Sequence, residues 1–277
     1  MAKGIGLIGN FRGKVGNMVG YNLKDSNNKQ TQGVRVYQPV VKNPKTYGQA
    51  EQRAKLAPIN ATYRALKAII DRGQEGKAYG NKSRLAWLSD AMKSFNGGWF
   101  EKGAAITVPA WVQLTKGSLP AIAIEDLDGG AATITCDGLQ SGATINTVAT
   151  FSTAILAGIT GLKAGDQITF VSLESLNGSL NAKVESVVLS TTDATALPFT
   201  VSPSNNAMSI SLTSTGIAAA IIVSREGDNG QHLRSDATLV KDNQLADDKT
   251  SNDDKEAAIK SYMSAGANTD WAEESLQ

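Results

Sequence analysis

The sequence predicts an α+β protein: a β-hairpin and a helical hairpin first, then a mainly antiparallel β-sandwich and a short C-terminal helix. Three observations predict this order. Glycines divide the first 44 residues into short apolar pieces, residues 46–95 keep an approximately helical apolar spacing, and short β-branched runs recur after about residue 104. We therefore expect three parts, residues 1–102, 103–241 and 242–277.

The N-terminal hairpin is predicted from two apolar runs that flank a polar stretch. Met18–Leu23 and Val34–Val41 both contain β-branched or aromatic residues, and residues 24–30 between them are typical of a turn. The glycines of this arm either allow close backbone approach or leave the arm pliable until it binds a partner.

The segment 43–46, Asn-Pro-Lys-Thr, is a helix-start signal, because proline suits the first helical turn and threonine caps it. The apolar spacing that follows predicts a helix to about Ile70, kinked or split near Ala57 because the ring of Pro58 blocks a backbone hydrogen bond. A second helix is predicted for Ser83–Phe95, antiparallel to the first.

The β region is predicted from short runs separated by glycine- and asparagine-rich turns, which is typical of an antiparallel Greek-key sandwich. The expected strands are Ala131–Cys136, Thr144–Ser152, Gln167–Leu173, Lys183–Leu189, Phe199–Ser202, Met208–Leu212, Ile217–Ser224 and Ala237–Val240.

The acidic segment 242–277 contains a short helical pattern from Lys255 to Met263, which Asp253 or Asp254 is placed to cap. Trp271 follows in a polar context. It belongs either to a solvated tail or to an arm that docks its tryptophan on a neighbouring subunit.

Composition excludes several classes of protein. With 277 residues and 41% hydrophobic residues, the chain can bury a core, so wholesale disorder is not expected. A single cysteine, Cys136, and a single histidine, His232, exclude an internal disulfide, a cysteine cluster and any two-histidine metal motif. No apolar run approaches the ~18–20 residues of a membrane helix, and the first residues lack a signal-peptide core. We expect a protein made in the cytoplasm.

Short stretches of the chain resemble catalytic or cofactor-binding motifs, but their spacing or the elements around them do not fit those motifs. Residues 4–9 match G-x-G-x-x-G, but no strand precedes them and a hairpin follows. Residues 9–15 fall one residue short of a phosphate loop, and Val15 replaces its Ser or Thr. The chain has no G-x-S-x-G elbow, and the carboxylates of residues 125–128 lack the spacing of a calcium loop. We predict no catalytic residue, metal or cofactor, and a protein that is not an enzyme.

Charge is divided unequally along the chain. Residues 1–102 hold 18 Lys and Arg against 6 Asp and Glu, a net charge of +12, and residues 103–277 hold 9 against 20, a net charge of −11. This asymmetry predicts a nucleic acid or another polyanion as partner of the basic part, or head-to-tail self-association.

The residues expected to make that contact are cations spread along the basic part, and tyrosines lie among them. Aromatic rings in such a position stack on unpaired bases. The cations are Arg12, Lys14, Lys24, Lys29, Arg35, Lys42, Lys45, Arg53 and Lys55, and the tyrosines are Tyr21, Tyr37 and Tyr47.

The run 11–21 (FRGKVGNMVGY), followed by VRVYQP at 34–39, KNPKT at 42–46 and QAEQRAK at 49–55, carries a family resemblance. Together with LTKGSLP at 114–120 and LRSD at 233–236, it resembles proteins of Bacteroidetes and their phages classed as a domain of unknown function. The match lies mainly in residues 9–57. The resemblance implies an N-terminal hairpin and helices followed by immunoglobulin-like β structure, in a phage setting, and it supplies no catalytic residue.

Three functions follow as hypotheses. The first is a non-enzymatic structural protein, a phage virion component that assembles in multiple copies, with itself or with other virion proteins, through its basic arm. The second is a cytoplasmic single-stranded nucleic-acid-binding protein. The third is a carbohydrate-binding or hydrolytic β-domain protein, which a deep cleft lined by converging carboxylates would favour.

Overall fold

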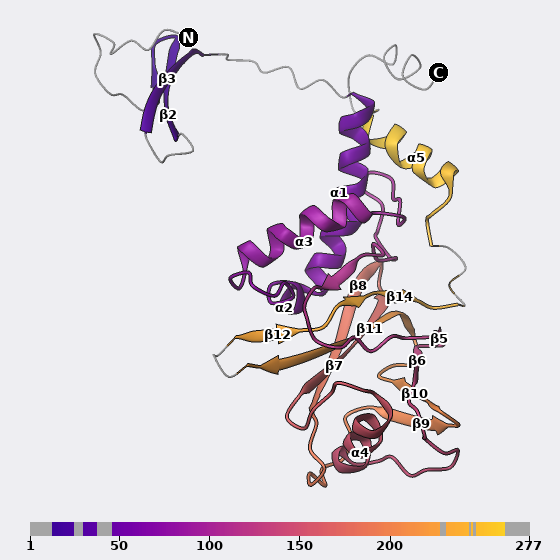
Figure 1. Ribbon diagram of the computed structural model, residues 1–277. Helices are drawn as coiled ribbons and strands as arrows, with labels where there is room; N and C mark the ends of the chain where they lie inside the picture. Colours follow the sequence, from indigo (N-terminus) through magenta and orange to yellow (C-terminus); the bar gives the residue numbers. More distant parts are fainter. Residues whose placement is uncertain are drawn as a thin grey trace. The chain divides into compact units, whose positions relative to one another are not determined.

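The computed structural model describes residues 13–24, 30–37, 46–227, 231–243, 245 and 248–263. The chain forms two compact units, residues 1–44 and residues 45–277. Helices and several antiparallel sheets make up these units (Figure 1), which confirms the predicted α+β class.

The first unit is a three-stranded antiparallel sheet of β1 (Gly13–Val15), β2 (Met18–Lys24) and β3 (Gln30–Val36), with β2 in the centre. The predicted hairpin is confirmed as β2 and β3. β3 begins at Gln30, earlier than expected, because backbone pairing with β2 continues into residues whose polar side chains indicated a turn.

The second unit begins with helix α1 (Tyr47–Ala65), whose cap is the predicted one: the Thr46 hydroxyl accepts a hydrogen bond from the Gln49 amide at 3.4 Å. The expected split near Ala57 is wrong, because the helix continues through Pro58. Pro58 is buried, and the buried Thr62 hydroxyl donates to its carbonyl at 3.0 Å, so tertiary packing holds the turn in place despite the missing amide.

The helix breaks instead at Leu66, between α1 and α2 (Lys67–Ile70). Helix α3 (Asn81–Ser94) lies close to the predicted range. It meets α1 through Tyr63 and Trp87, whose ring centroids are 6.1 Å apart.

The main sheet has the order β12-β11-β7-β8, and β14 also pairs with β11. The hairpin of β7 and β8 turns at Asn177 and Gly178, both with positive φ (51° and 74°), as a two-residue hairpin turn requires. The strands are β7 (Gln167–Leu176), β8 (Ser179–Val188), β11 (Gly216–Glu226), β12 (His232–Arg234) and β14 (Val240–Lys241).

A second antiparallel sheet has the order β5-β6-β10-β9, and a short two-stranded sheet pairs β4 with β13. These strands are β4 (Gln113–Thr115), β5 (Asp126–Asp128), β6 (Ala131–Thr135), β9 (Thr200–Ser204), β10 (Ala207–Ser211) and β13 (Ala237–Thr238).

The strand predicted at Thr144–Ser152 is wrong, because helix α4 (Val148–Gly158) occupies this region. Thr147 and Thr150 form a reciprocal capping box, in which each side chain accepts a hydrogen bond from the other residue's amide. The buried Phe151 and Ile155 stand four residues apart on one helix face. Capping and helical spacing outweigh the β-branched composition that favoured a strand.

The main sheet is covered on both faces. Ile221 and Val223 of β11 pack into a core shared with the second sheet and α4, whereas Ala220 and Ile222 pack into a core shared with α1 and α3. Figure 1 shows these helices on opposite sides of β7 and β11. The boundary expected after residue 102 therefore lies inside one compact unit, because helices and sheet share a core.

Helix α5 (Asn252–Met263) packs on α1 through Ala258 and Ile259, which join a cluster with Trp99. The predicted cap at Asp253 or Asp254 is wrong. The Ser251 hydroxyl accepts from the Asp254 amide at 3.0 Å, because serine at the residue before the helix reaches that amide, and both aspartates fall in the first turn. Trp271 lies outside the described residues.

Candidate polyanion-binding face

The register of the N-terminal sheet sorts its side chains onto two faces. β2 and β3 are paired from Met18 opposite Val36 to Lys24 opposite Gln30, and side chains at alternate positions point to opposite faces. One face, here called the apolar face, carries Met18, Val34 and Val36; the other, here called the basic face, carries Lys14, Val19, Tyr21, Arg35 and Tyr37.

The basic face combines cations with aromatic rings. The Lys14 amino group lies 3.6 Å from the centroid of the Tyr37 ring, a cation–π contact that links β1 to the end of β3. The side chains of Lys14, Tyr21 and Arg35 are exposed. Positive charges beside exposed aromatic rings are the elements that bind the phosphates and bases of a single strand.

Tyr21 lies across β3 because residue 33 is glycine. A Cβ at Gly33 would stand 2.7 Å from Cζ of Tyr21, closer than carbon atoms pack without displacing the ring. The glycine thus fixes where this aromatic side chain lies on the basic face.

The apolar face is exposed. Met18, Val34 and Val36 have 38%, 52% and 72% of their surface accessible. Adjacent exposed apolar side chains on one side of a small sheet mark an interaction surface, because water contact with them is unfavourable.

Of the residues predicted from the sequence, Lys14, Arg35, Tyr21 and Tyr37 are brought together on the basic face. Lys24 ends β2, at the opposite end of the hairpin from Lys14 and Tyr37. The predicted contact residues Arg12, Lys29, Lys42 and Lys45 lie outside the described residues.

Three predicted contact residues belong to α1 of the second unit. Lys55 pairs with Glu51 at 3.1 Å, and Arg53 is half-buried. Tyr47 is half-buried against the cluster that contains Trp99 and Ile259, so its ring contributes to packing there.

The cysteine and the histidine have different surroundings. Cys136 is fully buried, and its thiol donates to the Ala154 carbonyl at 3.3 Å. Burial, together with the nearby Asp137 carboxylate, raises the pKa of this thiol, so it is not poised to act as a thiolate. His232 begins β12, and its side chain is exposed.

Two other kinds of site are absent from the part of the chain that the structure describes. His, Cys, Asp and Glu side chains there form no group of three or more arranged to hold a metal ion. None of the helices described is both long and apolar enough to cross a bilayer.

Comparisons with known proteins identify no relative of this chain, so its function is inferred from the geometry of the structure. No protein-family model matches the chain, and neither the curated proteins nor the solved structures searched contain a match.

Sequence reasoning missed the apolar face. Its signal was the alternation of Val34 and Val36 around Arg35, with Met18 falling opposite once the strands are paired. That alternation identifies an amphipathic strand, but the pairing partner and the exposure come from the structure.

Proposed function

We propose that this protein is a non-enzymatic structural subunit that assembles in multiple copies through its N-terminal sheet. The observation that carries the proposal is the exposed apolar face of Met18, Val34 and Val36 on a sheet that forms a compact unit of its own.

A three-stranded sheet gains independent stability by burying one hydrophobic face. Here that face remains in contact with water, so covering it lowers the free energy of the assembled state. A second copy of the chain is the partner that we favour, because the two units have opposite net charges, +6 for residues 1–44 and −5 for residues 45–277, so that the units of neighbouring copies attract each other.

We place this subunit in a phage virion, as the sequence resemblance implies. A small sheet that binds neighbours and a larger unit with its own core suit a repeated building block. The proposal includes an immunoglobulin-like plan for the larger unit, which two antiparallel sheets that share one core support.

The test is the mass in solution, by size exclusion with light scattering, of the full chain and of the double variant Val34→Thr/Val36→Thr. The expected result is a multiple of 29.0 kDa for the parent chain and a shift toward 29.0 kDa for the variant. Two lost apolar contacts per interface should weaken association by about tenfold or more.

The matched control is Val184→Thr/Val188→Thr, two exposed strand valines of the second unit with 42% and 52% of their surface accessible. This control should keep the parent mass. A parent chain that stays at 29.0 kDa at high concentration and in both low and high salt would overturn the proposal.

A second function is favoured by the basic face itself: single-stranded nucleic-acid binding by Lys14, Arg35, Tyr21 and Tyr37. Fluorescence anisotropy with a labelled oligothymidine should then show binding that weakens with salt and with Tyr21→Ala or Lys14→Ala. Lys102→Ala, an exposed lysine of the second unit, is the control. Equal binding by Tyr21→Ala and the parent chain would reduce the contact to general electrostatics.

A further inference from the structure

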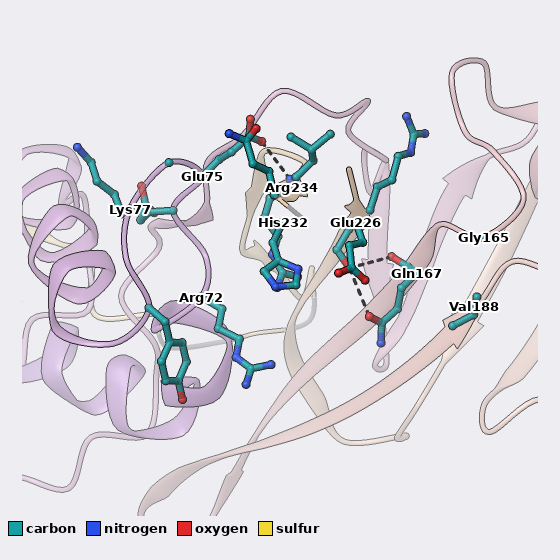
Figure 2. A pocket seen from close by; sticks show the side chains of 16 residues that line it. Arg72, Glu75, Lys77, Gly165, Gln167, Val188, Glu226, His232 and Arg234 are labelled. Carbon is teal, nitrogen blue, oxygen red and sulfur yellow. Dashed lines mark hydrogen bonds between the residues drawn. The ribbon is translucent and has the colours of Figure 1, made fainter. Parts of the chain in front are cut away.

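A cleft of about 720 Å³ opens on the second unit. It lies between the segment 72–79, which links α2 to α3, and the end of the main sheet where β11 pairs with β12. Figure 2 shows Arg72 and His232 pointing into the space between these elements, while Lys77 extends away from it.

Two guanidinium groups of the cleft have no counter-charge in the part of the chain that the structure describes. Neither Arg72 nor Arg234 has a side-chain ion pair among the described residues, and Nε of Arg234 is buried without a hydrogen-bond acceptor. Burial, and then the positive charge of Arg72, lowers the pKa of Arg234, so the two cations are close enough to repel each other.

The carboxylates of the cleft do not neutralise these arginines. Glu75 accepts hydrogen bonds from the Ser118 amide at 3.0 Å, the Ser118 hydroxyl at 2.8 Å and the Arg234 amide at 3.0 Å. Burial alone would raise the pKa of Glu75, but these bonds outweigh it and hold the pKa below its ordinary value. Glu75 therefore fixes the 72–79 segment against β12.

Among the described residues that line the cleft, the other carboxylate is Glu226. The third arginine of the lining, Arg225, is not an available cation, because its Nε and Nη2 groups donate to Asp166, which lies outside the lining, at 2.5 and 2.7 Å. Glu226 is exposed and stands opposite His232 in the pairing of β11 with β12. The described residues that line the cleft thus offer no pair of free, converging carboxylates of the kind that hydrolysis of a glycoside uses.

Tyr79 gives the cleft a flat surface: the residue is 66% exposed, and the Arg72 guanidinium lies 4.9 Å from the centroid of its ring. This contact orients the guanidinium of an otherwise exposed side chain. It also places an aromatic surface beside the charged part of the cleft.

We propose that this cleft binds an organic phosphate with a flat ring, such as a nucleotide, and holds its phosphate with the guanidinium groups of Arg72 and Arg234. Forked guanidinium donors match phosphate oxygens, and a dianion between two cations replaces their repulsion with attraction. A cleft of this volume holds much more than one phosphate, so the organic part lies against Tyr79. The inference goes beyond the assembly function and does not depend on it.

The test is calorimetric titration of the full chain at low salt with adenosine monophosphate and, separately, with inorganic phosphate. Arg72→Gln removes an exposed side chain and should leave the fold intact, yet weaken adenosine monophosphate binding by about tenfold or more. The control Arg64→Gln changes an exposed arginine of α1 outside the cleft and should bind like the parent chain. No heat from either ligand up to millimolar concentrations, or equal binding by Arg72→Gln, would overturn the proposal.

Further titrations identify the ligand. Tighter binding of adenosine monophosphate than of phosphate, lost in Tyr79→Ala, supports the ring contact, whereas equal affinity for the two ligands contradicts it. A 5′-phosphorylated oligonucleotide that matches adenosine monophosphate would identify a strand end as the source, and one that fails to bind would identify the free nucleotide.

A spectroscopic readout covers the case in which Arg234→Gln does not fold. In the parent chain, the Nε–H resonance of Arg234 should shift on titration with adenosine monophosphate, because the ligand changes the charge at its guanidinium. A resonance that stays fixed at saturating ligand would place the phosphate elsewhere.

Discussion

The two units of this protein use the same strand geometry with opposite burial. Val36 of β3 is 72% exposed, whereas Ile222 of β11 is 2% exposed, although both are β-branched residues in antiparallel strands. The difference lies in what covers each sheet: β11 has helices on one face and a second sheet on the other, while the apolar face of the N-terminal sheet is exposed. The second unit is therefore stabilised by its own core, whereas the first unit presents an exposed apolar face that a partner can cover.

The largest expected effect is on the core of the second unit. Phe170→Ala removes a ring that is 2% exposed and whose centroid lies 4.5 Å from that of Phe199. The free energy of unfolding should fall by about 3–5 kcal/mol, measured by denaturant titration with circular dichroism. A loss below about 1 kcal/mol would mean that this core is not what stabilises the unit.

The next effect concerns the ion pair of Asp166 and Arg225. Burial would raise the pKa of the Asp166 carboxyl, but hydrogen bonds from Arg225 and the Lys163 amide outweigh it and hold the pKa below its ordinary value. Asp166→Asn should lower the free energy of unfolding by about 3 kcal/mol at pH 7, because it leaves the half-buried Arg225 without its counter-charge.

The pH dependence follows from the direction of that shift. Stability from this carboxylate is present above its unfolded pKa, near pH 4, and is lost as pH falls further, through the lower folded pKa. The parent chain should therefore lose stability below about pH 4 more steeply than Asp166→Asn does. Parallel curves from pH 7 to pH 2 would contradict the assigned role.

The smallest effect compares one substitution in the two units. Val223→Thr places a hydroxyl at a fully buried position of β11 and should cost about 2 kcal/mol of unfolding free energy. Val36→Thr places it at an exposed position and should stay within about 0.5 kcal/mol for the isolated chain. Equal losses, measured at a concentration where the chain is monomeric, would show that the apolar face is covered within one molecule.

Some elements could be predicted from the sequence because local signals determine them. The Thr46 cap, the β2–β3 hairpin and the strand around Ile217–Ser224 follow from capping chemistry, turn residues and apolar runs. The unbroken α1 and the helix α4 could not be predicted in the same way. At Pro58 burial overrides a local breaker, and at Thr147 a capping box overrides β-branched composition.

The sequence predicts the residue types of the candidate site but not which of these residues lie together. Charge and ring type predict Lys14, Arg35, Tyr21 and Tyr37 as contact residues, and the strand register places them on one face. Arg72 and Arg234 stand far apart in the sequence and line one cleft through the tertiary fold, so local pattern does not reveal the phosphate site.

The most direct test of the contrast between the units is amide hydrogen exchange of the full chain at two concentrations, one below and one above its assembly threshold. The account predicts slow exchange in β7 and β11 at both concentrations, and in β1–β3 slow exchange only above the threshold. Equally slow exchange of β1–β3 in the dilute chain would show that this sheet is stable without a partner, and it would contradict the assembly role proposed for the apolar face.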